Sequence, residues 1–170
     1  MPERRSSNDY LAIYLNDHLA GSTVGIELAR RLRASNEGTE LGRDMAGICA
    51  EIEADRETLR RLMSHLGIGA SKVKPAGAWL LEKVGRLKLN GQLRGYSPLS
   101  RVVELEGLCT GVTGKMLLWR AMAHTFGTSL AGFDFDALAE RAAAQAARLE
   151  AHRLDAAAQV FGSASSSPSA

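Results

Sequence analysis

Apolar residues recur at helical spacing along this chain, most clearly between Leu41 and Leu66. Positions 41, 45, 48, 52, 55, 59, 62 and 66 are spaced alternately four and three residues apart. They carry Leu, Met, Ile, Ile, Asp, Leu, Leu and Leu. Such spacing lines one side of a helix of about seven turns and is typical of a helix in a bundle. Asp55 is the one polar member of this stripe. Three further acids surround it in the sequence: Glu51, Glu53 and Glu57.

Three more stretches carry a similar spacing between residues that begin or end helices. A helix commonly starts after Ser, Thr, Asp or Asn, and glycine commonly follows its C-terminus. The helices are expected at 8–35, 98–126 and 135–160. The expected N-terminal caps are Asn8 or Asp9, Ser97 and Asp134, and Gly38 and Gly127 end the first two. Thr39 caps the helix described above, and Gly67 ends it.

A shorter amphipathic segment lies between the second and third long helices. Pro75 suits a first helical turn, and an apolar side recurs at helical spacing after it. We therefore predict a helix over 75–89 that packs Leu80, Val84 and Leu87 on the bundle. Lys83, Arg86 and Lys88 are expected to stay in water.

The 170 residues are enough for one domain with a core of its own. We expect a polar leader at 1–7, a single all-α domain at 8–161 and a disordered Ser-rich tail at 162–170. The tail contains no apolar residue larger than alanine, so deleting 163–170 is expected to leave thermal stability unchanged.

Two long helical hairpins joined by a long helical connector resemble the ferritin-like superfamily over roughly residues 8–160. This resemblance implies an up-down-down-up bundle whose connector crosses between helices two and three. It also implies two metal ions, often iron, held by glutamates and Glu-x-x-His motifs. The motif is missing here: Ala54 stands third after Glu51, and Arg153 third after Glu150. No metal-binding role is therefore carried over to any residue.

Five polar residues interrupt or border the stripes: His18, Asp55, Glu106, Gln145 and His152. All of them except Gln145 form the candidate site. His18 and Asp55 each lie about 18 residues from the first turn, so an antiparallel hairpin brings them to one level. Glu106 and His152 are matched about the second turn in the same way. Each hairpin is expected to hold one acid–histidine pair, in which the carboxylate raises the pKa of the histidine.

An iron or manganese site would require both pairs at one level. In the crossover topology, Asp55 and Glu106 lie about 12 Å apart along the bundle axis. Metal ligands lie about 2 Å from the ion, so these two acids cannot share one. An up-down-up-down order of the helices would remove this axial separation. The metal hypothesis therefore depends on that order. We therefore favour structural hydrogen bonds, with Asp55 partly buried against His18.

Glycines recur on two of the predicted helices, at Gly21 and Gly25 and again at Gly107, Gly111 and Gly114. The second set precedes Lys115 but has neither the spacing nor the strand of a phosphate loop. Each glycine costs a helix about 1 kcal/mol relative to alanine. Close helix contact is the expected compensation, and a flat ligand bound on the glycine face is the alternative.

Charge and cysteine content add further expectations. The net charge is only +2, yet 69–101 contains seven basic residues and one acid. A solvated helix face is the favoured explanation of this connector, and phosphate or nucleic-acid binding is the alternative. Cys49 and Cys109 fall on apolar stripes and are expected to be reduced core residues. The longest apolar run is too short for a membrane span of about 20 residues, which favours a cytoplasmic protein that does not contact membranes.

The sequence favours a non-catalytic bundle that acts through protein–protein interaction, as a homodimer or another homo-oligomer. No serine or cysteine has a histidine and a carboxylate at a spacing typical of nucleophilic catalysis. A divergent iron-binding oxidoreductase of the ferritin-like kind is the first alternative. Phosphate or nucleic-acid binding through 72–101 is the second.

Overall fold

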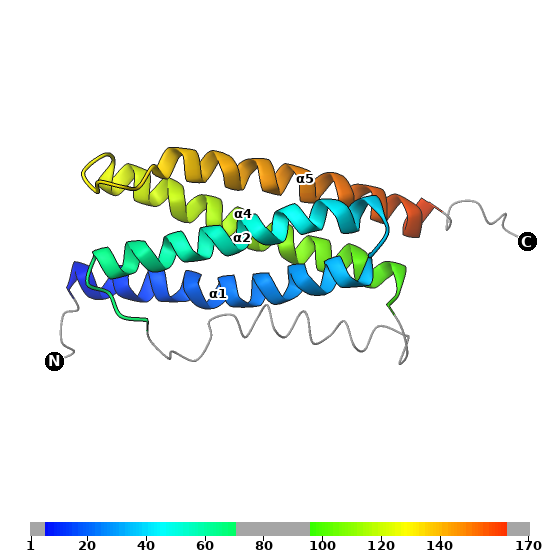
Figure 1. The fold of residues 1–170 in the computed structure, drawn as a ribbon, viewed down its shortest axis with the longest axis horizontal. Helices are drawn as coiled ribbons and strands as arrows, with labels where there is room; N and C mark the ends of the chain where they lie inside the picture. The colour runs from blue at the N-terminus through cyan, green and yellow to red at the C-terminus, as the bar shows by residue number, and fades with distance from the viewer. Residues whose placement is uncertain (1–5, 71–95, 163–170) are drawn as a thin grey trace, which may run out of the picture.

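The computed structural model describes residues 6–70 and 96–162 of this chain. These residues form four long helices, and neither described range contains a strand. The predicted all-α class is confirmed. In the labels of Figure 1, the helices are α1 (Ser7–Ser35), α2 (Glu40–His65), α4 (Pro98–Phe126) and α5 (Phe135–Phe161).

Side-chain caps fix where each helix begins. The predicted caps Thr39, Ser97 and Asp134 each accept a hydrogen bond from a backbone N–H in the first turn. The predicted cap of α1 at Asn8 or Asp9 is wrong, because Ser6 caps this helix. The Asp9 carboxylate instead accepts a hydrogen bond from the backbone N–H of Ser6 at 2.8 Å, and this reciprocal pair starts the helix earlier.

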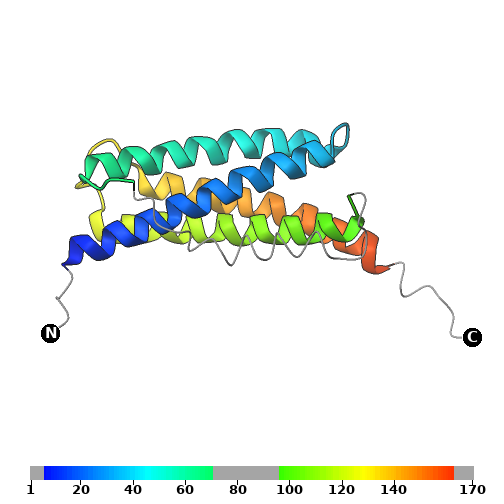
Figure 2. The ribbon, with the colours of Figure 1, turned by 90° about the horizontal axis from the view of Figure 1, so that it is seen from below.

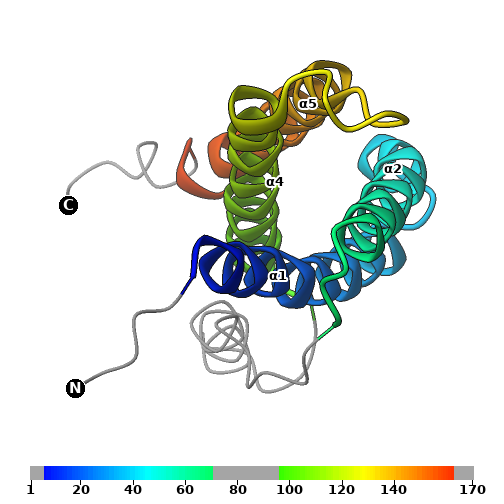
Figure 3. The ribbon, with the colours of Figure 1, turned by 90° about the vertical axis from the view of Figure 1, so that its left-hand side faces the viewer.

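The four helices lie side by side along the long axis of the molecule. In Figure 1, α1 and α5 run in one direction along this axis, while α2 and α4 run in the other. Figure 2 shows the same bundle from below, and Figure 3 shows it end-on, with the helices in the order α1, α4, α5, α2 around the axis. The helices α1 and α2 pack together, α4 packs along α5, and α1 also contacts α4.

The predicted apolar stripe of α2 faces the core. Every stripe position from Leu41 to Leu62 is buried, including Asp55, and Leu66 is half-buried. Trp119 of α4 is fully buried on the other side of the core and stacks on Phe135, with ring centroids 6.3 Å apart. The 4-3 spacing therefore predicted the buried face of this helix correctly.

The contact between α2 and α5 is smaller than the contacts of the other packed helix pairs, and charged side chains bridge these two helices. Arg148 reaches Glu51 at 2.9 Å and also pairs with Asp44. His152 lies 3.0 Å from the same aspartate. Between α1 and α4, Arg31 pairs with the buried Glu104 at 2.8 Å. Burial raises the pKa of this glutamate, and the pairing with Arg31 opposes the rise.

Three expectations concern residues outside the described ranges: the helix over 75–89, most of the basic connector and the tail from 163. None of the described helices is long and apolar enough to cross a membrane.

Gly42, in the first turn of α2, allows the preceding turn to approach closely. A Cβ built there would lie 2.1 Å from the backbone oxygen of Asn36. We predict that Gly42→Ala destabilises the protein by about 1–3 kcal/mol, because the backbone must move to make room. Urea denaturation measures the difference.

Gly47→Ala is the matched control on the same helix. Its Cβ would meet only the end of the Arg148 side chain, at an ordinary 3.5 Å. Better helix propensity should then stabilise the protein by up to about 1 kcal/mol. Equal effects of the two substitutions would contradict the steric argument.

Candidate functional site

A buried carboxylate connects three of the four helices. The Asp55 side chain of α2 is 1 % exposed and forms ion pairs with Lys115 of α4 and Arg141 of α5. Gln145 of α5 adds a hydrogen bond from its Nε2 at 3.4 Å. An unpaired buried charge is costly, so both partners are needed to hold the carboxylate in the core.

Lys115 crosses the core to reach this carboxylate. Its side chain is 15 % exposed and donates to both Asp55 and the Oε1 of Gln145. Burial lowers the pKa of Lys115, and the neighbouring Asp55 opposes this by favouring the charged ammonium. Gln145 is fully buried, and both of its polar atoms are used, one on Lys115 and one on Asp55.

The predicted pair of Asp55 with His18 is wrong. Both residues line the same cleft, but the partners of Asp55 come from α4 and α5. His18 instead packs edge-on against Tyr14, with ring centroids 4.7 Å apart. Burial lowers the pKa of His18, opposite to the predicted rise. Asp55 is also more deeply buried than predicted.

The predicted pair of Glu106 with His152 is also wrong. Glu106 is exposed, and His152 lies against Asp44 of α2 across the bundle. The hydrogen bond from Arg148 is the main reason that the pKa of Asp44 is lowered, and His152 adds to it. The distance of a residue from the turn does not determine the direction in which its side chain points.

The four candidate residues therefore do not meet at one point. Among the residues that the structure describes, no three or more His, Cys, Asp or Glu side chains are grouped to hold a metal ion. The acids that face the α2–α5 seam, Asp44, Glu51 and Asp55, each bind a cationic side chain.

A sequence signal for the seam was available. Three acids of α2 and four polar residues of α5 share helical spacing: Asp44, Glu51 and Asp55, and Arg141, Gln145, Arg148 and His152. Opposite charge on two such rows indicates a pair of facing helices. Reading only apolar stripes missed Arg141, Arg148 and the central role of Lys115.

The two cysteines behave as expected. Both are free thiols, with Cys49 buried and Cys109 half-buried. Burial raises the pKa of Cys49, and it raises that of Cys109 to about 11. Both thiols are therefore protonated at neutral pH and poor nucleophiles.

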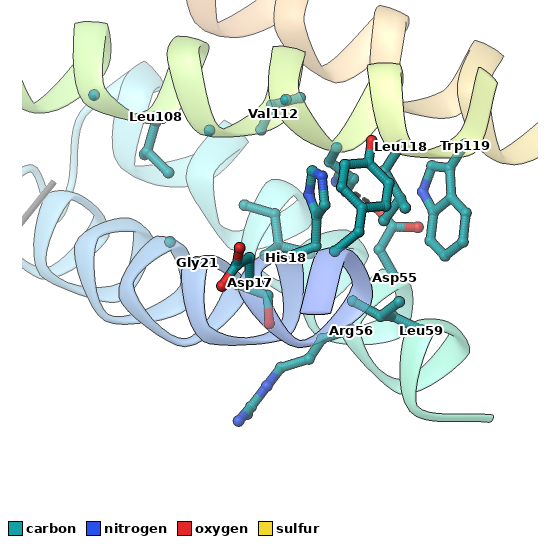
Figure 4. Close-up of a pocket in the computed structure, with 18 residues that line it drawn as sticks. Asp17, His18, Gly21, Asp55, Arg56, Leu59, Leu108, Val112, Leu118 and Trp119 are labelled. Carbon is teal, nitrogen blue, oxygen red and sulfur yellow. Dashed lines mark hydrogen bonds and ion pairs between the residues drawn. The ribbon is translucent and has the colours of Figure 1, made fainter. Parts of the chain in front are cut away.

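A cleft of about 390 Å³ lies between α1, α2 and α4 (Figure 4). Its apolar walls include Ile52, Leu59, Leu108, Val112 and Leu118. At one end are His18, Asp55 and Trp119, while Arg56 extends away from the other labelled side chains. Pockets of this size and character commonly hold small molecules.

Glycines form much of the α1 and α4 walls of this cleft. A Cβ added at Gly21, Gly25, Gly111 or Gly114 would meet nothing within 4 Å, so close helix contact does not require these four residues. Only Gly107 is close to a neighbour, at 3.2 Å from Leu28. The expected compensation by helix packing is therefore wrong at four of the five positions, which open into empty space instead.

The indole of Trp119 presents an unused donor at the end of this cleft. The residue is fully buried, and its Nε1 has no hydrogen-bond partner among the residues that the structure describes. Figure 4 shows this nitrogen on the side of the ring that faces the labelled His18, Leu118 and Asp55. Leaving such a donor unsatisfied costs about 1–3 kcal/mol.

Comparison with known proteins assigns no family to this chain. Protein-family models, curated proteins and solved structures were each searched, and none of them matches.

The partners of Asp55 can be tested by a double-mutant cycle. We predict that Asp55→Asn destabilises the protein by about 3 kcal/mol, because Lys115 loses its counter-charge in the core. Much of this cost should disappear in a Lys115→Met background, where the buried cation is already gone. Urea denaturation of the four proteins measures the coupling.

His18→Ala is the control background for that cycle. It should leave the cost of Asp55→Asn unchanged within about 0.5 kcal/mol, since His18 is not a partner of the carboxylate. A cost that vanished with His18 and persisted with Lys115→Met would restore the acid–histidine pair.

Proposed function

We propose that this protein is a non-catalytic helical bundle that binds a small, largely apolar molecule in the cleft between α1, α2 and α4. The observation that carries the proposal is the set of four glycines whose missing side chains leave room in the bundle. Larger residues at these positions would fill the cleft without striking any neighbour.

The energetic argument supports the same proposal. Glycine inside a helix is less favourable than alanine by about 1 kcal/mol, so four such positions cost the bundle several kcal/mol of helix stability. Apolar wall residues such as Val112 and Leu118 also lose contacts on their open side. A ligand in the cleft would restore those contacts and stabilise the folded state in proportion to its occupancy.

We further propose the ferritin-like, up-down-down-up order of helices for this bundle. The opposite directions of α1 and α2, and the common direction of α2 and α4, support it. The contact of Asp55 with Lys115 supports it as well. With α2 and α4 starting at one end, the α4 residue level with Asp55 lies about eight positions beyond Glu106, which is next to Lys115.

Binding can be tested with the neutral apolar dye Nile red. Its fluorescence should rise saturably with protein, at one site per chain. We predict that Gly111→Leu and Gly25→Leu, from opposite walls, each weaken binding by about tenfold or more, because leucine occupies the cleft. Both variants should be at least as stable as the original protein.

Ala144→Leu supplies the matched control. It adds the same side chain to an exposed position on α5, a helix that contributes no residue to the cleft. Dye binding should be unchanged. Equal binding by all four proteins, or none by the original protein, would overturn the proposal.

A second proposed function is self-association into a homodimer. Tyr10, Ile13 and Tyr14 share one side of α1 and are 61 %, 43 % and 37 % exposed. Exposed apolar side chains that share one side of a helix are typical of protein interfaces.

We predict that the protein sediments as a dimer at about 50 µM and that Ile13→Glu converts it to a monomer, because the charge would have to be buried. Leu154→Glu, at an exposed leucine of α5, should leave the dimer intact. A monomeric original protein at this concentration would contradict the proposed interface.

A further inference from the structure

The ligand class of the cleft follows from the groups at its end, if the cleft is the binding site proposed above. Trp119 has a buried indole N–H with no partner among the described residues, and an indole nitrogen can only donate. The group that fits against it is therefore a hydrogen-bond acceptor, such as a carbonyl, hydroxyl or carboxylate oxygen.

The charge of Lys115 narrows the choice of acceptor group. The single negative charge of Asp55 faces two positive partners, Lys115 and Arg141. Lys115 has three N–H donors, of which Asp55 and Gln145 account for two. Lys115 therefore has one N–H of a charged ammonium to spare, and a carboxylate is the acceptor that such a donor binds most strongly.

The lining of the cleft as a whole is formally neutral, because Asp55 offsets Lys115. Asp17 and Arg56 also line the cleft, and their formal charges offset each other. Glu51, which acts on Lys115 from α2, shares Arg148 with Asp44. Tyr14 and His18 are the remaining titratable lining groups. Burial raises the pKa of the tyrosine and lowers that of the histidine, so both are neutral at pH 7.

The two donors lie on one side of α4. Lys115 and Trp119 are separated by four residues, so their side chains are neighbours along the helix. A single carboxylate can therefore accept from both. Stacking of Trp119 on Phe135 holds the indole ring in place.

The shape of the cleft defines the rest of the molecule. On α4 the lining runs from Gly107 to Trp119, a length of about 18 Å at 1.5 Å per residue. A cleft of this length that is walled by glycines and aliphatic residues suits an extended hydrocarbon chain.

We propose that the cleft binds a carboxylic acid with an unbranched apolar tail. The carboxylate accepts hydrogen bonds from Trp119 Nε1 and Lys115 Nζ, and the tail lies along Gly114, Gly111 and Gly107 against Gly21 and Gly25 of α1.

Displacement of Nile red by four ligands tests this assignment: decanoate, decanol, decyltrimethylammonium and adamantane-1-carboxylate. Decanoate should bind about tenfold more tightly than decanol, which has the same tail without the charge. Decyltrimethylammonium should bind most weakly, because it brings a cation and no acceptor. The adamantane acid should bind more weakly than decanoate, because its compact tail cannot extend along the glycines.

Two variants locate the head group. Trp119→Phe should lower the affinity for decanoate by about tenfold, since one hydrogen bond to a charged group is lost. Lys115→Met should remove the preference for decanoate over decanol. Phe133→Leu, which alters the same aromatic stack but keeps the indole N–H, should retain that preference.

The outcomes separate this inference from the proposed function. If Nile red binds but decanoate and decanol displace it equally, or if Trp119→Phe leaves decanoate binding unchanged, the carboxylate assignment is wrong and the apolar cleft stands. If neither dye nor decanoate binds, the protein itself fills the cleft, and both proposals fail. A preference for decanoate that depends on Trp119 and Lys115 establishes the assignment.

Discussion

The arrangement of this bundle depends on the ion pairs of Asp55. A carboxylate that is almost fully buried on α2 is tolerated because Lys115 of α4 and Arg141 of α5 both reach it. These ion pairs also determine the position of α2 relative to α4 and α5. If α2 slid by one turn, or rotated by a third of a turn, a charge would remain in the core without its partner. Apolar side chains alone would tolerate such shifts much better, because their contacts are not directional.

Apolar contacts pack the helices within each hairpin, and polar contacts join the two hairpins. The stripes of α1 and α2, and those of α4 and α5, bury leucines, isoleucines and methionines within each hairpin. Between the hairpins, the α2–α5 seam is bridged by Asp44, Glu51 and Asp55 with their arginine and histidine partners. On the other side, Arg31 reaches the buried Glu104 across α1 and α4. The hairpins are thus aligned by directional contacts on both sides of the core.

The cleft lies against the same cluster, since Asp55 and Lys115 both line it. Glycines at Gly21, Gly25 and Gly111 leave space between the helices instead of drawing them together. Lys115 and Trp119, four residues apart on α4, lie at the end of the α4 wall, where the indole N–H of Trp119 has no partner among the described residues.

The sequence by itself determined the local features of this protein. Helix existence, the buried face of α2 and three of the four caps depend on residues within a few positions of one another, and apolar spacing and capping chemistry report them directly. The tertiary structure alone decided which side chains meet. The sequence placed His18 opposite Asp55, but the partners of Asp55 come from α4 and α5 and depend on how these helices are rotated and placed beside α2. The glycines are a second example. Their helical spacing can be read from the sequence, but the same spacing suits both closely packed helices and an open cleft. Only the distance between the two helices, which the tertiary structure sets, distinguishes these cases.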